Sequence, residues 1–383
     1  MSRKRPIQRF DVQESEGKSR TMGKYKKSLH GYSLYKKWRS FNVQLIMLSY
    51  DEHMSVAREE RGLVKARTMI GGMLAVAAVT AGGLWQAAVK SQTPQKIPIT
   101  LTPPMPFEDI TFESGGGQVQ GWFIPASPDV PKPWPLVIIA HGWGSNRSRV
   151  LRYARPIWEA GYALFMYDVR SHGASDEVRA ASAYLFRDDL LAALAYVSGR
   201  SEVDPKAIGV LGHSLGGLGT ILALTEGIPV SAVVTDSMPS QFQVIVSSEL
   251  RRRRLPLFPL AQLIPRIWFW RLGESLKTYQ QNDAVMMLNE RRRGMQLPLL
   301  MVHSKGDNFI PPSELEYFMS KADPPVEHLW VNSEGHSCSE EDPAFWETVI
   351  PFLKTHVCST SDSTAHEGAT SEQSETDLHH RTG

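Results

Sequence analysis

Residues 207–225 read AIGVLGHSLGGLGTILALT, and this stretch decides the fold. Its first part, Ala207–Leu211, is an apolar run that predicts a buried strand, and Leu215–Thr225 predicts a helix. The junction GHSLGG places Ser214 between two glycines. A tight turn from strand to helix leaves no room for side chains beside the serine, and Gly212 and Gly216 provide that room. The G-x-S-x-G pattern in this context predicts a nucleophile elbow that presents the Ser214 hydroxyl above a sheet.

The chain around this junction, residues 107–357, alternates between strand-like and helix-like runs. Two short strands are joined through Gly115-Gly116-Gly117 as a hairpin, and an apolar run from Pro135 to Ala140 is typical of a strand covered on both faces. The predicted strands are Phe107–Phe112, Val119–Ile124, Pro135–Ala140, Ala163–Tyr167, Ala207–Leu211, Ser231–Thr235, Leu297–Val302 and Val326–Val331, and the predicted helices are Val150–Ala160, Leu185–Gly199, Leu215–Thr225 and Ala344–His356. This alternation predicts an α/β fold with a mostly parallel sheet and helices on both faces.

A second loop with chemical potential follows the strand Pro135–Ala140. It reads His141-Gly142-Trp143-Gly144, and its position suits an oxyanion loop. We expect the backbone N–H groups of Trp143 and Leu215 to face the developing alkoxide, and the Trp143 ring is a candidate for the wall of an acyl pocket. For His141 we favour a structural role that shapes the loop.

The acid and base candidates come later in the chain. Asp307 lies in HSKGDNFIPP just past a strand, and His336 lies in EGHS in a loop after the next strand. The order Ser214, Asp307, His336 is the one expected for a catalytic triad in which the imidazole takes the serine proton and the carboxylate orients the ring. Asp236 also ends a strand, so it is a rival acid, although a turn-capping role is the simpler interpretation.

Other polar residues are predicted to be structural or peripheral. The loop YDVRSHGASD is expected to be a hydrogen-bonded turn that supports the rim of the site. The residues predicted to be structural or peripheral are His172, His213, His303, Asp168 and Arg170. The sequence has no HExxH, no paired CxxC and no Walker-type phosphate loop, so no metal, cofactor or nucleic acid is expected. Two cysteines, Cys338 and Cys358, rule out a disulfide-framed fold and leave their own pairing open.

With these motifs in order, residues 107–357 resemble the α/β-hydrolase superfamily. The pieces that carry the resemblance are HGWGSNRS, GYALFMYDVRSHGAS, GHSLGG, HSKGDNFIPP and EGHS, and they cover the whole globular part. The pattern is similar to a bacterial group of serine hydrolases that includes esterases, serine aminopeptidase-like members and membrane-anchored relatives. The resemblance implies an eight-stranded sheet with Ser214, Asp307 and His336 as the triad. Ser304, directly after His303 in HSKGD, stands where relatives commonly have glycine, which we expect to alter the loop geometry only.

Residues 238–296 lie between the sixth and seventh strands, where such folds insert a short helical lid. The segment contains LPLFPLAQLIPRIWFW, and its aromatic residues favour an acyl or aryl substrate unless they only form the packing core of the lid. The arginine runs 251–254 and 291–293 are expected to be solvated surface, with membrane phosphate contact as the alternative.

The charge of the chain is distributed unequally around one apolar segment. The total is 42 Lys and Arg against 40 Asp and Glu, yet residues 1–67 contain 16 basic and 7 acidic residues. Residues 68–89, TMIGGMLAVAAVTAGGLWQAAV, carry no charge, and as a helix they would span about 33 Å, enough to cross a bilayer. The positive-inside rule then predicts a single-pass membrane anchor with a cytoplasmic N-terminus and an extracytoplasmic hydrolase domain. A cleaved signal peptide with a secreted product and a buried soluble helix are the alternatives.

The remaining segments are predicted from their composition. Residues 1–67 are expected to be a basic, largely disordered segment, loosely helical as an alternative over about residues 1–53, and a true start at Met47 or Met54 is a further alternative. Residues 90–106 form a Pro-rich linker, residues 107–357 the hydrolase domain, and residues 358–383 a disordered tail rich in Ser, Thr, Glu and His.

These observations predict a serine hydrolase that cleaves carboxylic esters through an acyl-enzyme, with Ser214, Asp307 and His336 as catalytic residues and Trp143 and Leu215 as the oxyanion hole. The substrate would be a small-molecule ester or acyl compound, and the natural substrate is left open. A serine peptidase acting on short peptides is the second choice, an acyltransferase the third, and a non-catalytic binding protein on the same fold is the alternative from another class.

Overall fold

The structure is a computed structural model that describes residues 29–275, 277, 283–292 and 297–359. The chain divides into two compact units, residues 1–79 and residues 80–383. The second unit contains the sheet, the helices that cover it and the end of the first helix. The predicted tail, residues 358–383, lies outside the described residues from residue 360 on, as do residues 1–28 at the N-terminal end.

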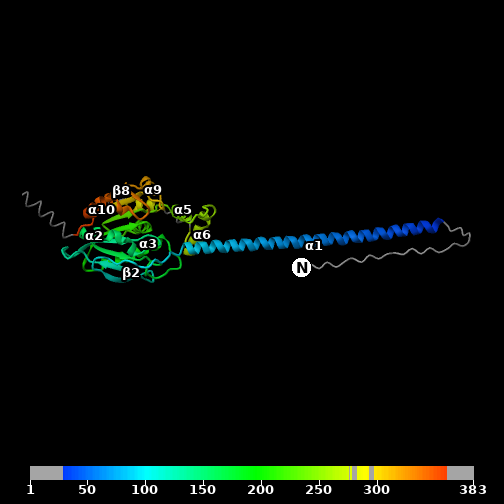
Figure 1. Ribbon diagram of the computed structural model, residues 1–383, viewed down its shortest axis with the longest axis horizontal. Coiled ribbons are helices and arrows are strands. Elements are labelled where there is room, and N and C mark those ends of the chain that lie inside the picture. Colours follow the sequence, from blue (N-terminus) through cyan, green and yellow to red (C-terminus); the bar gives the residue numbers. More distant parts are fainter. Residues whose placement is uncertain (1–28, 276, 278–282, 293–296, 360–383) are drawn as a thin grey trace, which may run out of the picture. The chain divides into compact units, whose positions relative to one another are not determined.

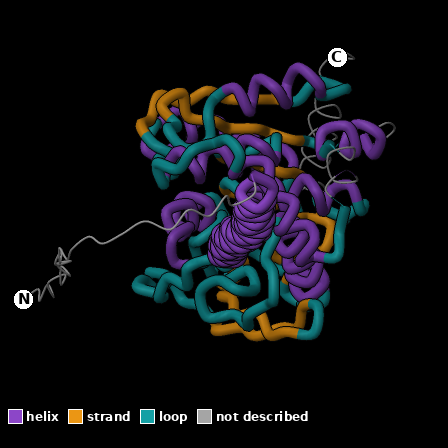
Figure 2. The backbone as a smooth tube through the Cα atoms, turned by 90° about the vertical axis from the view of Figure 1, so that its right-hand side faces the viewer, coloured by secondary structure: helices purple, strands orange, loops and turns teal. Residues whose placement is uncertain are grey.

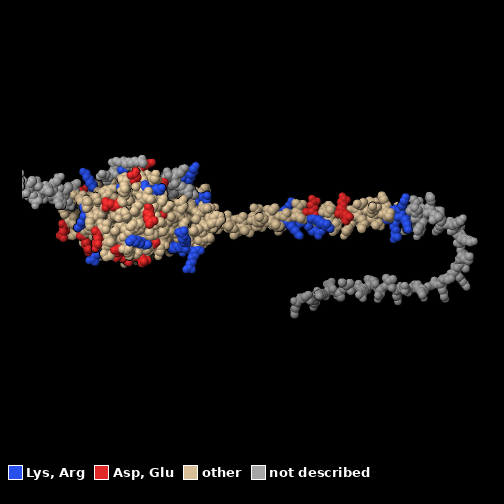
Figure 3. Space-filling model, turned by 90° about the horizontal axis from the view of Figure 1, so that it is seen from above, with Lys and Arg blue, Asp and Glu red and all other residues tan. Residues whose placement is uncertain are grey.

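The first unit consists, in its described part, of one long helix. Helix α1 runs from Leu29 to Ser91, so its last turns belong to the second unit. Residues 29–67 are therefore helical in the structure, which is more order than the largely disordered or loosely helical segment that was expected. The reason is local, because residues 29–91 contain no proline and their two most frequent residues, Ala and Leu, are good helix formers. The uncharged residues 68–89 lie inside α1, and Figure 3 shows them as a tan stretch between coloured charges. By length and composition this helix could cross a membrane or serve as a signal sequence.

The second unit is built on one eight-stranded sheet, as the resemblance implied. Its strand order is β1-β2-β4-β3-β5-β6-β7-β8. β2 pairs antiparallel with β1 and with β4, and the pairs from β4 to β8 are parallel, so the prediction of a mostly parallel sheet is confirmed. The strands are β1 (Glu108–Ser114), β2 (Gly117–Ile124), β3 (Trp134–Ala140), β4 (Ala163–Tyr167), β5 (Val203–His213), β6 (Ala232–Asp236), β7 (Leu299–Gly306) and β8 (Glu327–Glu334).

Helices cover both faces of this sheet, and each face has its own apolar core. One core joins the sheet to α3 (Ala183–Ser198), α4 (Leu215–Thr225), α8 (Ala284–Arg292) and α9 (Ser313–Lys321). The other joins it to the 3-10 helix η1 (Arg147–Tyr153), to α2 (Ala154–Glu159) and to α10 (Pro343–His356). Figure 2 shows these helices in purple around the orange strands. Continuous burial of β3, β4 and β6 explains why those strands read as unbroken apolar runs.

The insertion between β6 and β7 is helical over most of its described residues. Its described helices are α5 (Phe242–Arg252), α6 (Leu260–Leu272) and α8, and Figure 1 shows α5 and α6 at one end of the domain. α5 and α6 share a small apolar cluster with the end of α1, whereas α8 packs on α4. The insertion therefore starts at the carboxyl end of β6, at the edge of the sheet where Ser214 also lies.

Candidate active site

Ser214 lies at the sharp turn between β5 and α4. Its backbone has φ 53° and ψ −122°, a left-handed conformation that is strained for a residue with a side chain. A Cβ on Gly216 would lie 2.5 Å from the carbonyl oxygens of Ala140 and His141, and one on Gly212 would lie 2.7 Å from the backbone of Gly217. Only glycine fits at these two positions, so the steric argument from the sequence holds in the structure.

Two later loops bring their polar side chains to this serine. Nε2 of His336 lies 2.8 Å from Oγ of Ser214, and Nδ1 of His336 lies 2.7 Å from Oδ2 of Asp307. His336 follows β8 and Asp307 follows β7, and because parallel strands end at the same edge of the sheet, residues 122 positions apart meet here. If Nδ1–H donates to Asp307, Nε2 is left as the acceptor for the serine proton.

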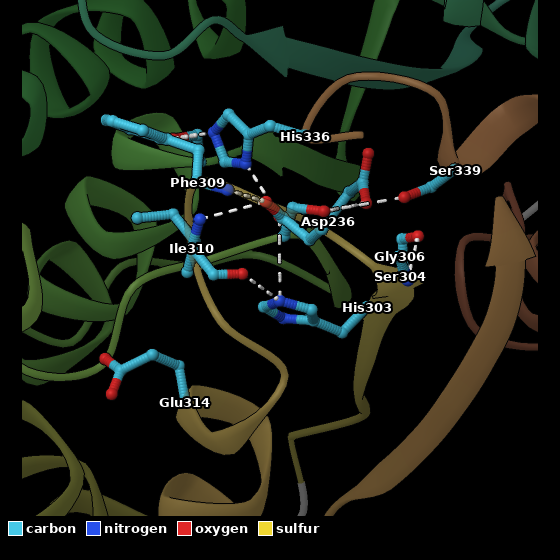
Figure 4. Close-up of polar contacts among 12 residues, drawn as sticks. Asp236, His303, Ser304, Gly306, Phe309, Ile310, Glu314, His336 and Ser339 are labelled. Atoms are coloured by element: carbon cyan, nitrogen blue, oxygen red, sulfur yellow. Dashed lines mark hydrogen bonds and ion pairs between the residues drawn. The ribbon is translucent and has the colours of Figure 1, made fainter. Parts of the chain in front are cut away.

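Asp307 is held in place by its own loop. Its Oδ1 accepts hydrogen bonds from the backbone N–H groups of Phe309 and Ile310, and its side chain is fully buried. His303 approaches Oδ2 at 3.7 Å and also contacts the carbonyl oxygen of Ile310. Figure 4 shows His336 and His303 on opposite sides of these contacts. Burial raises the pKa of Asp307, but the contact with His336 and the two backbone N–H groups outweigh it and hold the pKa below its usual range.

The rival acid, Asp236, is committed to other partners. Its carboxylate accepts a hydrogen bond from the Tyr153 hydroxyl and lies 3.2 Å from Nδ1 of His213. Nε2 of His213 lies 3.1 Å from Oγ of Ser337, the neighbour of His336. Burial alone would raise the pKa of Asp236. The contacts with His213 and Tyr153 outweigh burial and hold the pKa well below its usual range. Asp236 thus belongs to a buried network that holds the loop carrying His336.

Three histidines in this region, His141, His172 and His213, are kept neutral by burial. Desolvation lowers the pKa of His213 to about 4, with a smaller contribution from the positive charge of Arg152. Desolvation also lowers the pKa of His141 to about 4 and that of His172 to about 3. Nε2 of His141 accepts a hydrogen bond from the N–H of Val169, so protonation there would break that bond. The prediction that these residues are structural agrees with their burial and contacts.

The loop after β3 lies directly against the serine. A Cβ on Gly142 would meet the Cβ of Ser214 at 2.9 Å, so the backbone of this loop is in contact with the nucleophile candidate. Trp143 follows, and its ring packs on His172 and Phe186 while 37% of the residue stays exposed. Leu215 is the first residue of α4, where the helix N-terminus adds positive potential. Leu215 thus follows Ser214 directly in the chain, and Trp143 follows Gly142, whose backbone contacts the serine.

The loop after β4 supports this arrangement through buried ion pairs. Asp168 pairs with Arg147 and accepts the backbone N–H of Ala174, and Arg170 pairs with Asp189 at 2.7 Å. Burial raises the pKa of Asp168 and of Asp189 despite their arginine partners. The sequence predicted a hydrogen-bonded turn here, but it carried no signal for the partners Arg147 and Asp189, which belong to other elements.

Ser337, Tyr153 and Arg152 are the other residues that the sequence reasoning missed. They have no motif: Ser337 follows His336 in the chain, and the packing of η1 and α10 on the sheet brings Tyr153 to His213, which in turn contacts Ser337. Among the described residues there is no cluster of three or more His, Cys, Asp or Glu side chains that could hold a metal ion. What the arrangement offers is proton transfer, from a hydroxyl to an imidazole that a carboxylate orients.

Comparisons with known proteins agree with this architecture. The chain is 27% identical over 257 residues to the protein YfhR of Escherichia coli O157:H7, covering 65% of this chain and 81% of YfhR. It is 23% identical over 269 residues to the alpha/beta hydrolase domain-containing protein WAV2 of Arabidopsis thaliana, covering 66% of this chain and 80% of WAV2. The solved esterase Pf2001 of Pyrococcus furiosus has a TM-score of 0.53 at 21% identity, covering 69% of this chain and 100% of that structure. The model of the alpha/beta hydrolase family matches residues 137–349, more than half of the chain, and the protein belongs to that family.

Proposed function

We propose that this protein is a membrane-anchored serine hydrolase that cleaves carboxylic esters. One observation carries the proposal. The hydroxyl of Ser214, on a strained elbow, is joined through His336 to the buried carboxylate of Asp307 by contacts of 2.8 and 2.7 Å. Such a chain makes a weakly nucleophilic hydroxyl reactive, because the base takes its proton as the hydroxyl attacks.

The reaction would proceed in two halves. Oγ of Ser214 attacks the ester carbonyl carbon while Nε2 of His336 takes its proton, and the backbone N–H groups of Trp143 and Leu215 stabilise the oxyanion. The tetrahedral intermediate collapses when His336 returns the proton to the leaving alcohol, and an acyl-enzyme remains. Water then attacks the acyl carbon, His336 takes its proton, and the carboxylic acid leaves as Ser214 regains its hydrogen.

The membrane part of the proposal rests on α1. Residues 68–89 are uncharged over a length that can cross the hydrocarbon core, and basic residues precede them in excess. We therefore propose that α1 anchors the chain with its N-terminus in the cytoplasm and the hydrolase domain outside. In this proposal residues 90–106 are the spacer, residues 107–357 are the catalytic domain, and residues 238–296 are its lid.

One labelling experiment tests both the chemistry and the side of the membrane. A membrane-impermeant fluorophosphonate probe is added to spheroplasts that express the full chain, and in parallel to lysed cells. We expect equal labelling of the wild type in both samples. The Ser214→Ala variant should lose the label, whereas Ser201→Ala, at an exposed serine outside the site, should keep it.

The outcomes separate the two claims. Labelling of the lysate alone would overturn the extracytoplasmic placement and leave the serine mechanism standing. An unlabelled wild type in both samples would sink the serine hydrolase itself. Competition of the labelling with short esters and short peptides then identifies the substrate class, and we expect esters to compete.

A further inference from the structure

The lid exposes a surface that is both apolar and basic. Its large apolar side chains point outward on the loop between α5 and α6 and on α6 itself: Phe258 is 77% exposed and Trp270 67% exposed, against 1% for the buried Trp122. Single exposed apolar side chains are common, but several of them gathered on one surface indicate that the surface is covered in use. We call this the lid surface, and its apolar members are Trp85, Leu255, Leu257, Phe258, Leu263 and Trp270.

The lid surface is attached to the end of α1 within the second unit. The indole Nε1 of Trp268 donates to the carbonyl oxygen of Ala88 at 2.9 Å, and Arg271 donates to the side chain of Gln92 at 2.7 Å. The rings of Trp85 and Trp270 meet edge to face, with centroids 5.5 Å apart. Ala88 is completely buried in the cluster that it forms with α5 and α6. The lid therefore packs on the last turns of the apolar segment itself.

The charge of the lid is strongly positive. Residues 238–272 contain six arginines and one acidic residue, Glu249. Glu249 pairs with Arg252 and Arg253, and the neighbouring Arg251 and Arg254 are exposed at the end of α5. A surface of exposed aromatic rings beside guanidinium groups matches the headgroup region of an anionic bilayer.

We propose that the lid surface lies in the interface of the membrane that α1 enters and binds anionic lipid headgroups. Its place follows from the chain: Trp85 and Ala88 are among the last residues of the uncharged segment 68–89, so a bilayer that holds this segment ends beside the lid. Tryptophan is typical of this depth, because its ring is apolar and its N–H is polar. The bilayer is thus the partner of the lid surface, because the segment that would enter the bilayer leads directly to the lid.

The proposal is tested with the full chain in lipid vesicles. A polarity-sensitive fluorophore is attached at position 258 of a Phe258→Cys variant that also carries Cys338→Ser and Cys358→Ser. The matched control is labelled at the native Cys358, which is exposed beyond α10, in a Cys338→Ser background. Vesicles contain spin-labelled lipid in either phosphatidylcholine or a mixture with phosphatidylglycerol.

We expect the label at position 258 to be quenched several-fold more than the label at Cys358, and more strongly with phosphatidylglycerol than without it. Arg251→Gln with Arg254→Gln should abolish the difference between the lipids, since both arginines are exposed and lie outside the Glu249 pairs. Equal quenching at positions 258 and 358 would overturn the proposal. Equal quenching in the two lipids would refute the claim that the lid surface binds anionic headgroups. A blue shift of the label at position 258 without quenching would show that protein, and not lipid, covers the surface.

The readout is independent of catalysis, and insertion of α1 is measured separately as resistance of vesicle-bound protein to alkaline extraction. Inserted protein whose label at position 258 remains in water would refute the lid surface and leave the anchor and the hydrolase standing.

Discussion

At the scale of single residues, the candidate site depends on how two aspartates are divided between two histidines. Asp307 faces His336, and Asp236 faces His213, although both aspartates follow strands and both precede the His336 loop in the chain. The sequence ranked Asp307 first by its order relative to that loop. The contacts of Asp236 with Tyr153 and His213 give the physical reason why the ranking agrees with the geometry, since its carboxylate is already used.

This division predicts different defects for two similar substitutions. Asp307→Asn should lower ester turnover by about four orders of magnitude, because an amide NH2 facing Nδ1 of His336 favours the wrong tautomer. Asp236→Asn should instead destabilise the fold by about 1–3 kcal/mol, because it leaves buried partners unsatisfied. Turnover of a short ester and chemical unfolding of both variants provide the measurement. Loss of turnover confined to Asp236→Asn would show that the proposed acid is the wrong one.

At the scale of elements, the elbow between β5 and α4 depends on close backbone contact. α4 begins immediately after Ser214, and its second residue, Gly216, lies beneath the carbonyl groups that end β3. The chain was predicted correctly here because the constraint is local in sequence. The start of α1 also has a local cause, since good helix formers make a helix there, but its basic, polar composition did not predict an ordered element.

The elbow can be tested by replacing one glycine inside it and one glycine outside it with alanine. Gly216→Ala should destabilise the protein by about 1–3 kcal/mol and reduce turnover, since the new Cβ would lie 2.5 Å from two backbone oxygens that cannot move cheaply. Gly199→Ala, at the C-cap of α3 with φ −84° and its nearest neighbour at 3.5 Å, should be tolerated. Thermal unfolding of the two purified variants measures their stability. Equal unfolding midpoints for Gly216→Ala and Gly199→Ala would contradict the steric account.

At the scale of the whole molecule, the domain buries several ionisable groups around the site. His141, His172 and His213 have pKa values lowered to about 4, 3 and 4 by burial, whereas an unfolded histidine titrates near 6.5. Between these values the unfolded chain binds more protons than the folded one. Their stabilising contribution is therefore complete above about pH 6.5 and is lost as the pH falls toward about 4.

We expect the unfolding midpoint to fall steeply from pH 7 to pH 4.5, with each of these histidines contributing about 1.4 kcal/mol per pH unit. His172→Asn should reduce the dependence of the unfolding midpoint on pH, because the amide of asparagine does not titrate between pH 7 and pH 4.5. This expectation holds at any stability that the variant has at pH 7. Calorimetry over a pH series makes the comparison. An unchanged slope would mean that His172 is not held neutral by the fold.

By itself, the sequence determined the alternation of strands and helices, the elbow at Ser214, the order of Asp307 and His336, and the presence of an uncharged segment at residues 68–89. These features depend on periodicity, on glycines and on neighbours along the chain. Only the tertiary structure decided which acid meets His336, which network holds Ser337, and where α5 and α6 pack on the end of α1. Those contacts join residues from separate strands and loops, and a partner is selected there by the closeness of strand ends, which no local pattern records.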